Sequence, residues 1–367
     1  MLKGLFILFF MCVFMPMSNA HYQHGLSFEN VDLTLKEAQD HLVVLPEKSL
    51  TILDKNSHKI TVANDEQQAQ WHFIAMLAAV SVADLDRLHA ALISFEPLSN
   101  TEYYQAHLDQ ILSALGIWFR RSGYLNDAKA SYLCSLEKSS TEHSKLRALL
   151  NLGVVERNLN HFAQAKEINL IALDIATNIE SETYIAVLQN NLGILAISEK
   201  RYMDASAHFT KALELNEKLN RRSGELISSM NLLLAFLYQD NSLYFERMVD
   251  RAQRKLLLSP DDTARESYLN ILKAINSART IPSSLEQSRQ VILANIERVN
   301  DKGIQLLLTP LINQLGVQYN IQQQQSLDTI YQGPLLEQFS MCNWQLNSDN
   351  ANMQAIIGTF AESLFQD

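Results

Sequence analysis

Residues 190–220 read NNLGILAISEKRYMDASAHFTKALELNEKLN, and this stretch decides the fold. Its tripeptide Asn191-Leu192-Gly193 has counterparts 40 residues away on both sides, Asn151-Leu152-Gly153 and Asn231-Leu232-Leu233. A weaker copy, Ala114-Leu115-Gly116, precedes Gly153 by 37 residues. Self-similarity at a nearly fixed period predicts a chain built from repeated supersecondary units.

The residues that follow each glycine also recur at fixed offsets. Nine positions on stand Leu125, Phe162 and Tyr202; twelve on, Ala128, Ala165 and Ala205; sixteen on, Tyr132, Asn169 and Phe209; nineteen on, Ser135, Ala172 and Ala212. Small residues are needed where the two helices of a hairpin nearly touch. We expect the aromatic residues to fill the wedge between one hairpin and the next. Because a lone hairpin would expose an apolar face, the copies should stack.

The segment from about Asp109 to Leu258 resembles tetratricopeptide repeats, and residues 190–220 match that family's motif best. The 40-residue period is similar to the longer variety of the repeat found in kinesin light chains and in bacterial peptide-sensing regulators. The resemblance implies an all-α fold, a right-handed α-solenoid of stacked antiparallel helix hairpins. Scarcity of glycine (11) and proline (7) also favours long helices with short turns.

Four segments are expected along the chain: a signal peptide over 1–20, degenerate helical repeats over 21–104, tetratricopeptide-like repeats over 105–258, and divergent helical repeats or a cap over 259–367. In the last segment we expect Pro310 and Pro334 to interrupt the helices. We interpret this segment as the atypical capping end that solenoids need for solubility. A separate partner-binding tail is the alternative.

The first residues have the form of a secretory signal peptide. Lys3 precedes an apolar run from Leu5 to Met17, and Ser18-Asn19-Ala20 supplies small residues at a cleavage site. The run is short of the ~20 apolar residues that span a bilayer. We therefore expect cleavage after Ala20 and a periplasmic or secreted bacterial protein without stable membrane insertion. An uncleaved N-terminal anchor is the alternative.

Cleavage would leave two cysteines, Cys134 and Cys342. In an extended solenoid they should lie farther apart than the ~7 Å between Cα atoms that a disulfide tolerates, which predicts two free thiols.

The common enzyme motifs are absent from the sequence. The closest glycines, Gly116 and Gly123, are too far apart for a phosphate loop, a dinucleotide-binding turn or a nucleophile elbow. No His-Glu-x-x-His or Cys-x-x-Cys occurs. A net charge of −10 argues against nucleic acid as a partner. We expect no catalytic residue, metal or cofactor. The alternative is copper binding or enzyme activity through His21 at the mature N-terminus, with His24 completing the site.

In tetratricopeptide repeats the first helix of each hairpin lines the concave surface, and the resemblance therefore implies a partner-binding groove. Its basic end would come from the first two copies and its apolar end from the last two. Carried over by motif position, its residues are Gln110, Ser113, Ile117, Arg120 and Arg121; Arg147, Leu150, Val154, Arg157 and Asn158; Val187, Asn190, Ile194, Ile197 and Ser198; and Ile227, Met230, Leu234, Leu237 and Tyr238. Such a groove suits a peptide with an acidic and a hydrophobic end. Alternatively, several of these residues face solvent without a ligand.

Asn151, Asn191 and Asn231 recur at one position of three successive first helices. Asparagine is a mediocre helix former, so its recurrence needs a reason. Its amide can pair with both polar groups of an extended backbone, and we interpret the row as a grip on a peptide. The alternative is that each amide bonds the neighbouring hairpin. The sequence thus predicts a non-enzymatic scaffold for a protein or peptide in the bacterial envelope, acting in signalling or envelope assembly.

Overall fold

The computed structural model describes residues 20–257, 262–299, 301–319, 331–335 and 339, and within 20–30 it describes the backbone alone. All regular structure in these residues is helical. The α-helices are α1 (Ala20–His41), α2 (Pro46–Lys55), α3 (Asp65–Val82), α4 (Leu85–Ile93), α5 (Glu102–Ala106), α6 (Leu108–Ser122), α7 (Leu125–Lys138), α8 (Glu142–Asn158), α9 (Phe162–Asn178), α10 (Glu182–Ser198), α11 (Tyr202–Lys218), α12 (Arg222–Tyr238), α13 (Ser242–Leu256), α14 (Thr263–Thr280), α15 (Leu285–Asn295) and α16 (Lys302–Gln314). Short 3₁₀ helices are η1 (Ser57–Val62), η2 (Glu96–Leu98), η3 (Pro282–Ser284) and η4 (Ile296–Arg298).

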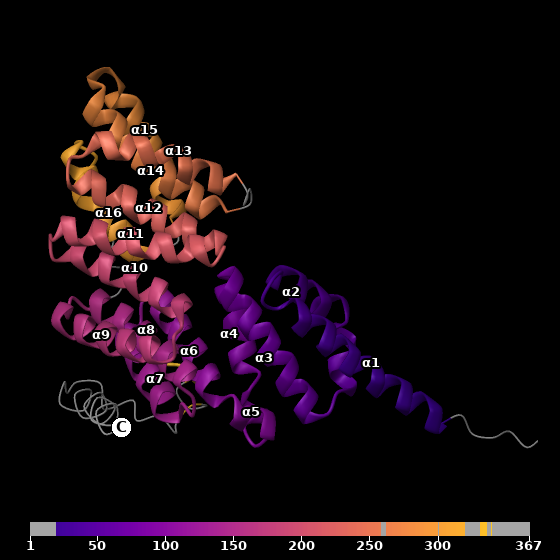
Figure 1. Ribbon diagram of the computed structural model, residues 1–367. Coiled ribbons are helices and arrows are strands. Elements are labelled where there is room, and N and C mark those ends of the chain that lie inside the picture. Colours follow the sequence, from indigo (N-terminus) through magenta and orange to yellow (C-terminus); the bar gives the residue numbers. More distant parts are fainter. Residues whose placement is uncertain (1–19, 258–261, 300, 320–330, 336–338, 340–367) are drawn as a thin grey trace, which may run out of the picture.

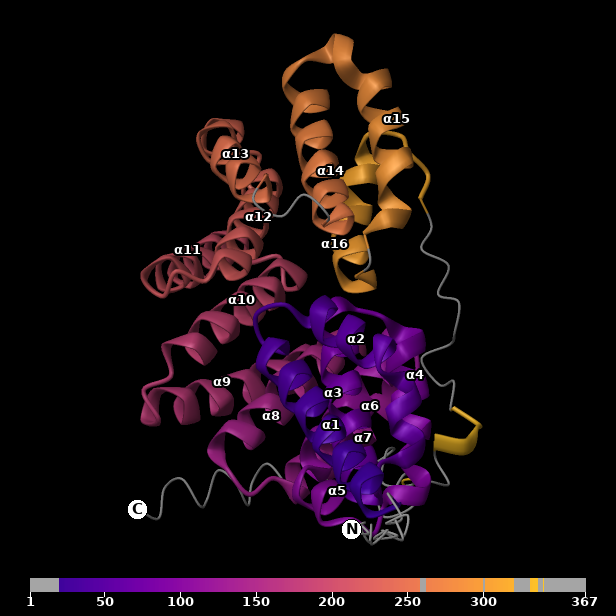
Figure 2. The same ribbon diagram turned by 90° about the vertical axis from the view of Figure 1, so that its right-hand side faces the viewer.

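Successive helices pair as hairpins, and the hairpins stack in chain order (Figures 1 and 2). The central pairs are α6–α7, α8–α9, α10–α11 and α12–α13, one for each copy of the repeat. The flanking pairs are α1–α2, α3–α4 and α14–α15. The predicted all-α stack of antiparallel hairpins is therefore confirmed.

The first helices α6, α8 and α10 each need their glycine because a side chain of the second helix lies on it. A Cβ at Gly116 would lie 2.5 Å from Cε1 of Tyr132, and a Cβ at Gly193 would overlap the ring of Phe209. The residue at offset sixteen thus packs inside its own hairpin, and its expected place between hairpins is wrong. The ring fills the space that the missing side chain leaves. The residue nine positions after the glycine does bridge two hairpins, since Tyr202 of α11 stacks on Tyr238 of α12 with ring centroids 4.8 Å apart.

The turns between helices pass through the left-handed region. Within the central hairpins the residues with positive φ are Gly123, Asn160, Lys200 and Asp240, and between hairpins they are Glu180 and Asn220. This conformation closes a bond from the next residue back to the helix, as from the Arg201 amide to the Ala196 carbonyl at 2.8 Å. Glycine alone adopts it without steric cost, so most of these turns are strained.

Apolar side chains of the described residues form three clusters, one from α1 to α3, one from α3 to α10 and one from α10 to just beyond α16. The alanines at offsets twelve and nineteen, such as Ala205 and Ala212, are fully buried, as close helix packing demands. The expected interruption at Pro310 is wrong, because α16 continues through it. Burial of Leu308 and Leu311 on either side offsets the backbone hydrogen bond that proline cannot make. Pro334 lies where little of the chain is described.

Candidate functional site

The apolar end of the predicted groove is covered by the C-terminal helices of the same chain. Ile194 and Ile197 of α10 and Met230 and Leu237 of α12 are buried, in the same cluster as Leu308, Leu311 and Ile312 of α16. The sequence suggested an open apolar surface there. It could not indicate that a later helix would pack on it, because the residues of α16 match no repeat. The C-terminal helices therefore bury this part of the predicted groove.

Polar contacts hold α16 in this place. The Tyr238 hydroxyl donates to the Leu307 carbonyl at 2.5 Å, and Arg279 of α14 donates to the Leu237 carbonyl at 2.5 Å and to Oε1 of Gln314 at 2.9 Å. Burial raises the pKa of Tyr238 well above its usual range, which keeps its hydroxyl a donor. Tyr238, predicted as a groove residue, thus contacts the chain's own backbone.

The asparagines predicted to line the groove fall into two groups, those that bond a neighbouring helix and those that do not. Nδ2 of Asn231 lies 3.4 Å from Oδ1 of Asn190, whose own Nδ2 donates to Oγ of Ser228 at 2.9 Å. Asn190 and Asn231 are both buried, so these contacts tie α10 to α12. Asn151 and Asn191 are half-buried, and their side-chain amides make no hydrogen bond with the described part of the chain. Those two amides thus stay unpaired within the described chain, whereas Asn190 and Asn231 make the contacts of the stacking alternative.

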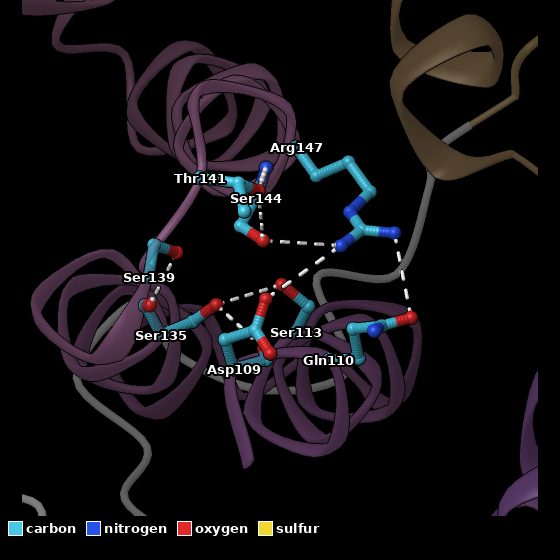
Figure 3. Close-up of polar contacts among 8 residues, drawn as sticks. All are labelled: Asp109, Gln110, Ser113, Ser135, Ser139, Thr141, Ser144 and Arg147. Atoms are coloured by element: carbon cyan, nitrogen blue, oxygen red, sulfur yellow. Dashed lines mark hydrogen bonds and ion pairs between the residues drawn. The ribbon is translucent and has the colours of Figure 1, made fainter. Parts of the chain in front are cut away.

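Arg147 of α8 reaches back to the preceding hairpin (Figure 3). Its guanidinium lies 3.6 Å from Oδ2 of Asp109 and 3.4 Å from Oε1 of Gln110, both on α6, and 3.4 Å from Oγ of Ser144 on its own helix. Beside them, the hydroxyls of Ser113 and Ser135 lie 2.8 Å apart. Arg147 is therefore partnered within the stack.

The other three predicted arginines gather at the carboxyl ends of α6 and α8. Arg120 and Arg121 lie in the last turn of α6 and Arg157 in the last turn of α8, and all three are half-buried. Burial lowers the pKa of Arg121 and of Arg157, and the charge of Arg120 lowers both further. The opposing charge is that of Asp301, which precedes α16.

A buried ionic group between α7 and α8 gave no signal in the sequence. Glu156 is completely buried and pairs with Nζ of Lys129 at 2.9 Å and with Nδ1 of His161 at 2.7 Å. The pair of Lys129 and Glu156 ties α7 to α8, and removing one partner would leave an uncompensated buried charge. In an amphipathic helix pattern, charged residues are predicted to face solvent. The burial of Glu156 becomes apparent only when the neighbouring hairpin is placed against it.

Tyr331, near the C-terminus, lies against the α6–α7 hairpin. The Tyr331 amide donates to Oδ2 of Asp127 at 2.9 Å, and the Tyr331 ring lies between 5.2 and 5.4 Å from the rings of Trp118, Phe119 and Tyr124. Cys134, on the same hairpin, is disulfide-bonded, so the expectation of two free thiols is wrong. The expectation assumed an extended tail, whereas Tyr331, Leu335 and Phe339 lie in the apolar cluster of the stack.

The described residues bear only partly on the predictions about the leader, metal binding and membrane insertion. The leader and its cleavage site lie outside the described residues up to Asn19, and the side chains of His21 and His24 are not described. Among the described side chains, no three of His, Cys, Asp and Glu gather as metal ligands. No described helix is long and apolar enough to cross a membrane. A shallow polar hollow of about 320 Å³ lies between α1 and α3, lined by Asp32, Lys36, Gln39, Asp40 and Gln70.

No protein-family model matches the chain, and no curated protein matches it. Several solved structures are similar to it. BtubC (BKLC) from P. vanneervenii has a TM-score of 0.43 and 18% identity, covering 63% of this chain and 92% of that one. A Rap protein complexed with competence and sporulation factor has a TM-score of 0.49 and 11% identity, with 78% and 97% covered. The apo form of RapI has a TM-score of 0.43 and 14% identity, with 89% and 99% covered.

Proposed function

We propose that this protein is a non-enzymatic scaffold that holds a protein or peptide segment against the first helices of its central hairpins. The observation that carries the proposal is the state of Asn151 and Asn191. Their amides are half-buried at one register of successive first helices, and within the described part of the chain they have no partner. An amide offers a donor and an acceptor together, which are what an extended peptide backbone requires. Two such amides on neighbouring hairpins would hold a backbone without reading its side chains.

The bacterial envelope is the proposed location, in a signalling or assembly role. Two observations support it. The chain begins with a positive residue, an apolar run and small residues, in the order of a secretory signal peptide. Cys134 is disulfide-bonded, and structural disulfides persist in oxidising compartments such as the periplasm.

The test begins with capture of partners from envelope extract by the processed protein and their identification by mass spectrometry. The affinity for the identified partner is then measured with the parent chain and with Asn191→Ala. Losing one amide should weaken binding by about 1–3 kcal/mol, because the partner's backbone groups are stranded, and should leave the melting temperature nearly unchanged.

Asn231→Ala is the matched comparison, because its amide is buried against Asn190. That variant should lower the melting temperature, whereas binding measured well below this temperature should survive. If Asn191→Ala instead lowers stability and leaves affinity intact, the row only stiffens the stack and the proposal fails.

A further inference from the structure

The cluster of Arg120, Arg121 and Arg157 has more positive charge and more hydrogen-bond donors than the described chain satisfies. None of the three guanidinium groups has a described carboxylate within ion-pair distance. Nε of Arg120 and Nη1 of Arg121 are buried without a hydrogen-bond partner among the described residues. Arg157 donates only to Oδ1 of the adjacent Asn158, at 3.1 Å. Each buried donor left unpaired costs about 1–3 kcal/mol, so this arrangement needs an explanation.

Tyr132 adds a further donor beside these arginines. Its ring lies on Gly116, and its hydroxyl is buried without a partner in the described chain. Burial raises the pKa of Tyr132 to about 12, and nearby Arg120 and Arg121 lower it only in part. The hydroxyl therefore stays protonated and can donate. The Tyr132 oxygen can accept from the neighbouring Arg120, but a guanidinium accepts no hydrogen bond, so the Tyr132 proton and the remaining arginine donors still need acceptors.

Asp301 stands beside the cluster but is committed elsewhere. Its Oδ1 caps α16 by accepting from the Ile304 amide at 3.1 Å. The first turn of α16 lies directly on the cluster, since a Cβ at Gly303 would be 3.1 Å from Nη2 of Arg157 and 3.5 Å from Oδ1 of Asn158. One carboxylate that already caps a helix leaves most of the charge of three arginines unneutralised.

We infer that Arg120, Arg121, Arg157 and the Tyr132 hydroxyl form a binding site for a carboxylate group of an acidic peptide segment. The site rests on the proposed scaffold function and specifies the chemistry of the partner. Guanidinium groups match a carboxylate in shape and bind it through two parallel hydrogen bonds. Asp301 takes part of that position in the unliganded chain, so a peptide carboxylate competes with the first turn of α16.

A carboxylate suits the site better than a nucleic-acid backbone does. The chain has 40 acidic against 30 basic residues, and the cluster is confined to the ends of two helices. A nucleic acid needs a wide basic surface, which this composition opposes. Small phosphate ions share the anionic chemistry, and one arm of the test separates them from carboxylates.

The test is calorimetric titration of the full processed chain with a blocked hexaglutamate peptide. Hexaglutamine of the same length is the uncharged comparison, and inorganic phosphate is the second anion. We expect saturable binding of hexaglutamate alone. Arg157→Gln should weaken it at least about tenfold, the equivalent of one hydrogen bond to a charged group. Arg87→Gln is the control, because Arg87 pairs with Asp54 on the N-terminal hairpins, and it should leave binding unchanged.

Asp301→Asn is the decisive variant. Asparagine is as good an N-cap as aspartate, so α16 keeps its start while the competing charge is removed. Affinity for hexaglutamate should rise by about threefold to tenfold with unchanged helicity in circular dichroism.

Weaker or unchanged binding by Asp301→Asn would overturn the competition, and equal binding by Arg157→Gln would overturn the site. Preferential binding of phosphate would overturn the assignment to carboxylates. If one of these results is obtained while partner binding still depends on Asn191, the carboxylate site is refuted and the proposed scaffold function is unaffected.

Discussion

Gly193→Ala should destabilise the protein, although alanine is the better helix former. Gly193 lies in the middle of α10, where a Cβ would stand 2.7 Å from Cδ1 and 2.8 Å from Cζ of Phe209. Phe209 is fully buried, so its ring cannot swing away. Overpacking of a rigid core costs up to about 3 kcal/mol, and the helix propensity of alanine over glycine returns about 1 kcal/mol. The expected net loss is therefore about 2 kcal/mol.

The assay is urea unfolding followed by far-ultraviolet circular dichroism. Ala207→Gly, at an exposed position of α11 in the same hairpin, measures the propensity difference alone and should cost about 1 kcal/mol. In a Phe209→Leu background the added methyl group finds space, and Gly193→Ala should then be nearly neutral. The double-mutant cycle should give a coupling energy of about 1–2 kcal/mol. A Gly193→Ala variant as stable as its parent would refute the reasoning, because the ring would not lie on the glycine.

Three further predictions concern the turns, the pH response and the disulfide. Lys200→Gly should stabilise the chain by about 1 kcal/mol, because Lys200 has a φ of 61° that only glycine adopts freely; a lower urea midpoint would contradict this. Burial lowers the pKa of His72 from 6.5 to about 4, so the unfolded chain binds its proton more tightly and stability should fall as pH drops from 6.5 toward 4. The loss reaches about 3 kcal/mol and should shrink in His72→Gln, and an unchanged pH slope in that variant would assign the effect to other groups. Alkylation of unfolded protein without a reductant should leave Cys134 unmodified, and modification there before reduction would show a free thiol.

The candidate site was only partly accessible from the sequence. Motif position singled out Arg120, Arg121 and Arg157 as groove residues, and the structure gathers these three at the ends of α6 and α8, because register within a helix follows from its period. It could not show that Asp301 and Gly303 of α16 lie against these arginines, since more than a hundred positions along the chain separate them. Nor could the sequence show which asparagines bond a neighbouring helix and which do not. Whether an amide bonds a neighbour depends on the local side chains, such as Asn190 and Ser228 beside Asn231.

The sequence by itself determined the helices, their hairpin pairing and the small residues at their crossings. These features depend on residues close in the chain, through the helical period and the contact of Gly193 with Phe209 sixteen positions later. Only the tertiary structure decided which part of the concave face stays open. Tertiary packing places α16 against α12 and α14 and in one apolar cluster with α10, where Met230 and Leu237 are buried, while the arginines stay short of acceptors. The reason is physical: each hairpin contacts mainly its neighbours, so the position of α16 relative to α8, α10 and α12 depends on all the packing steps between them and on no single repeat.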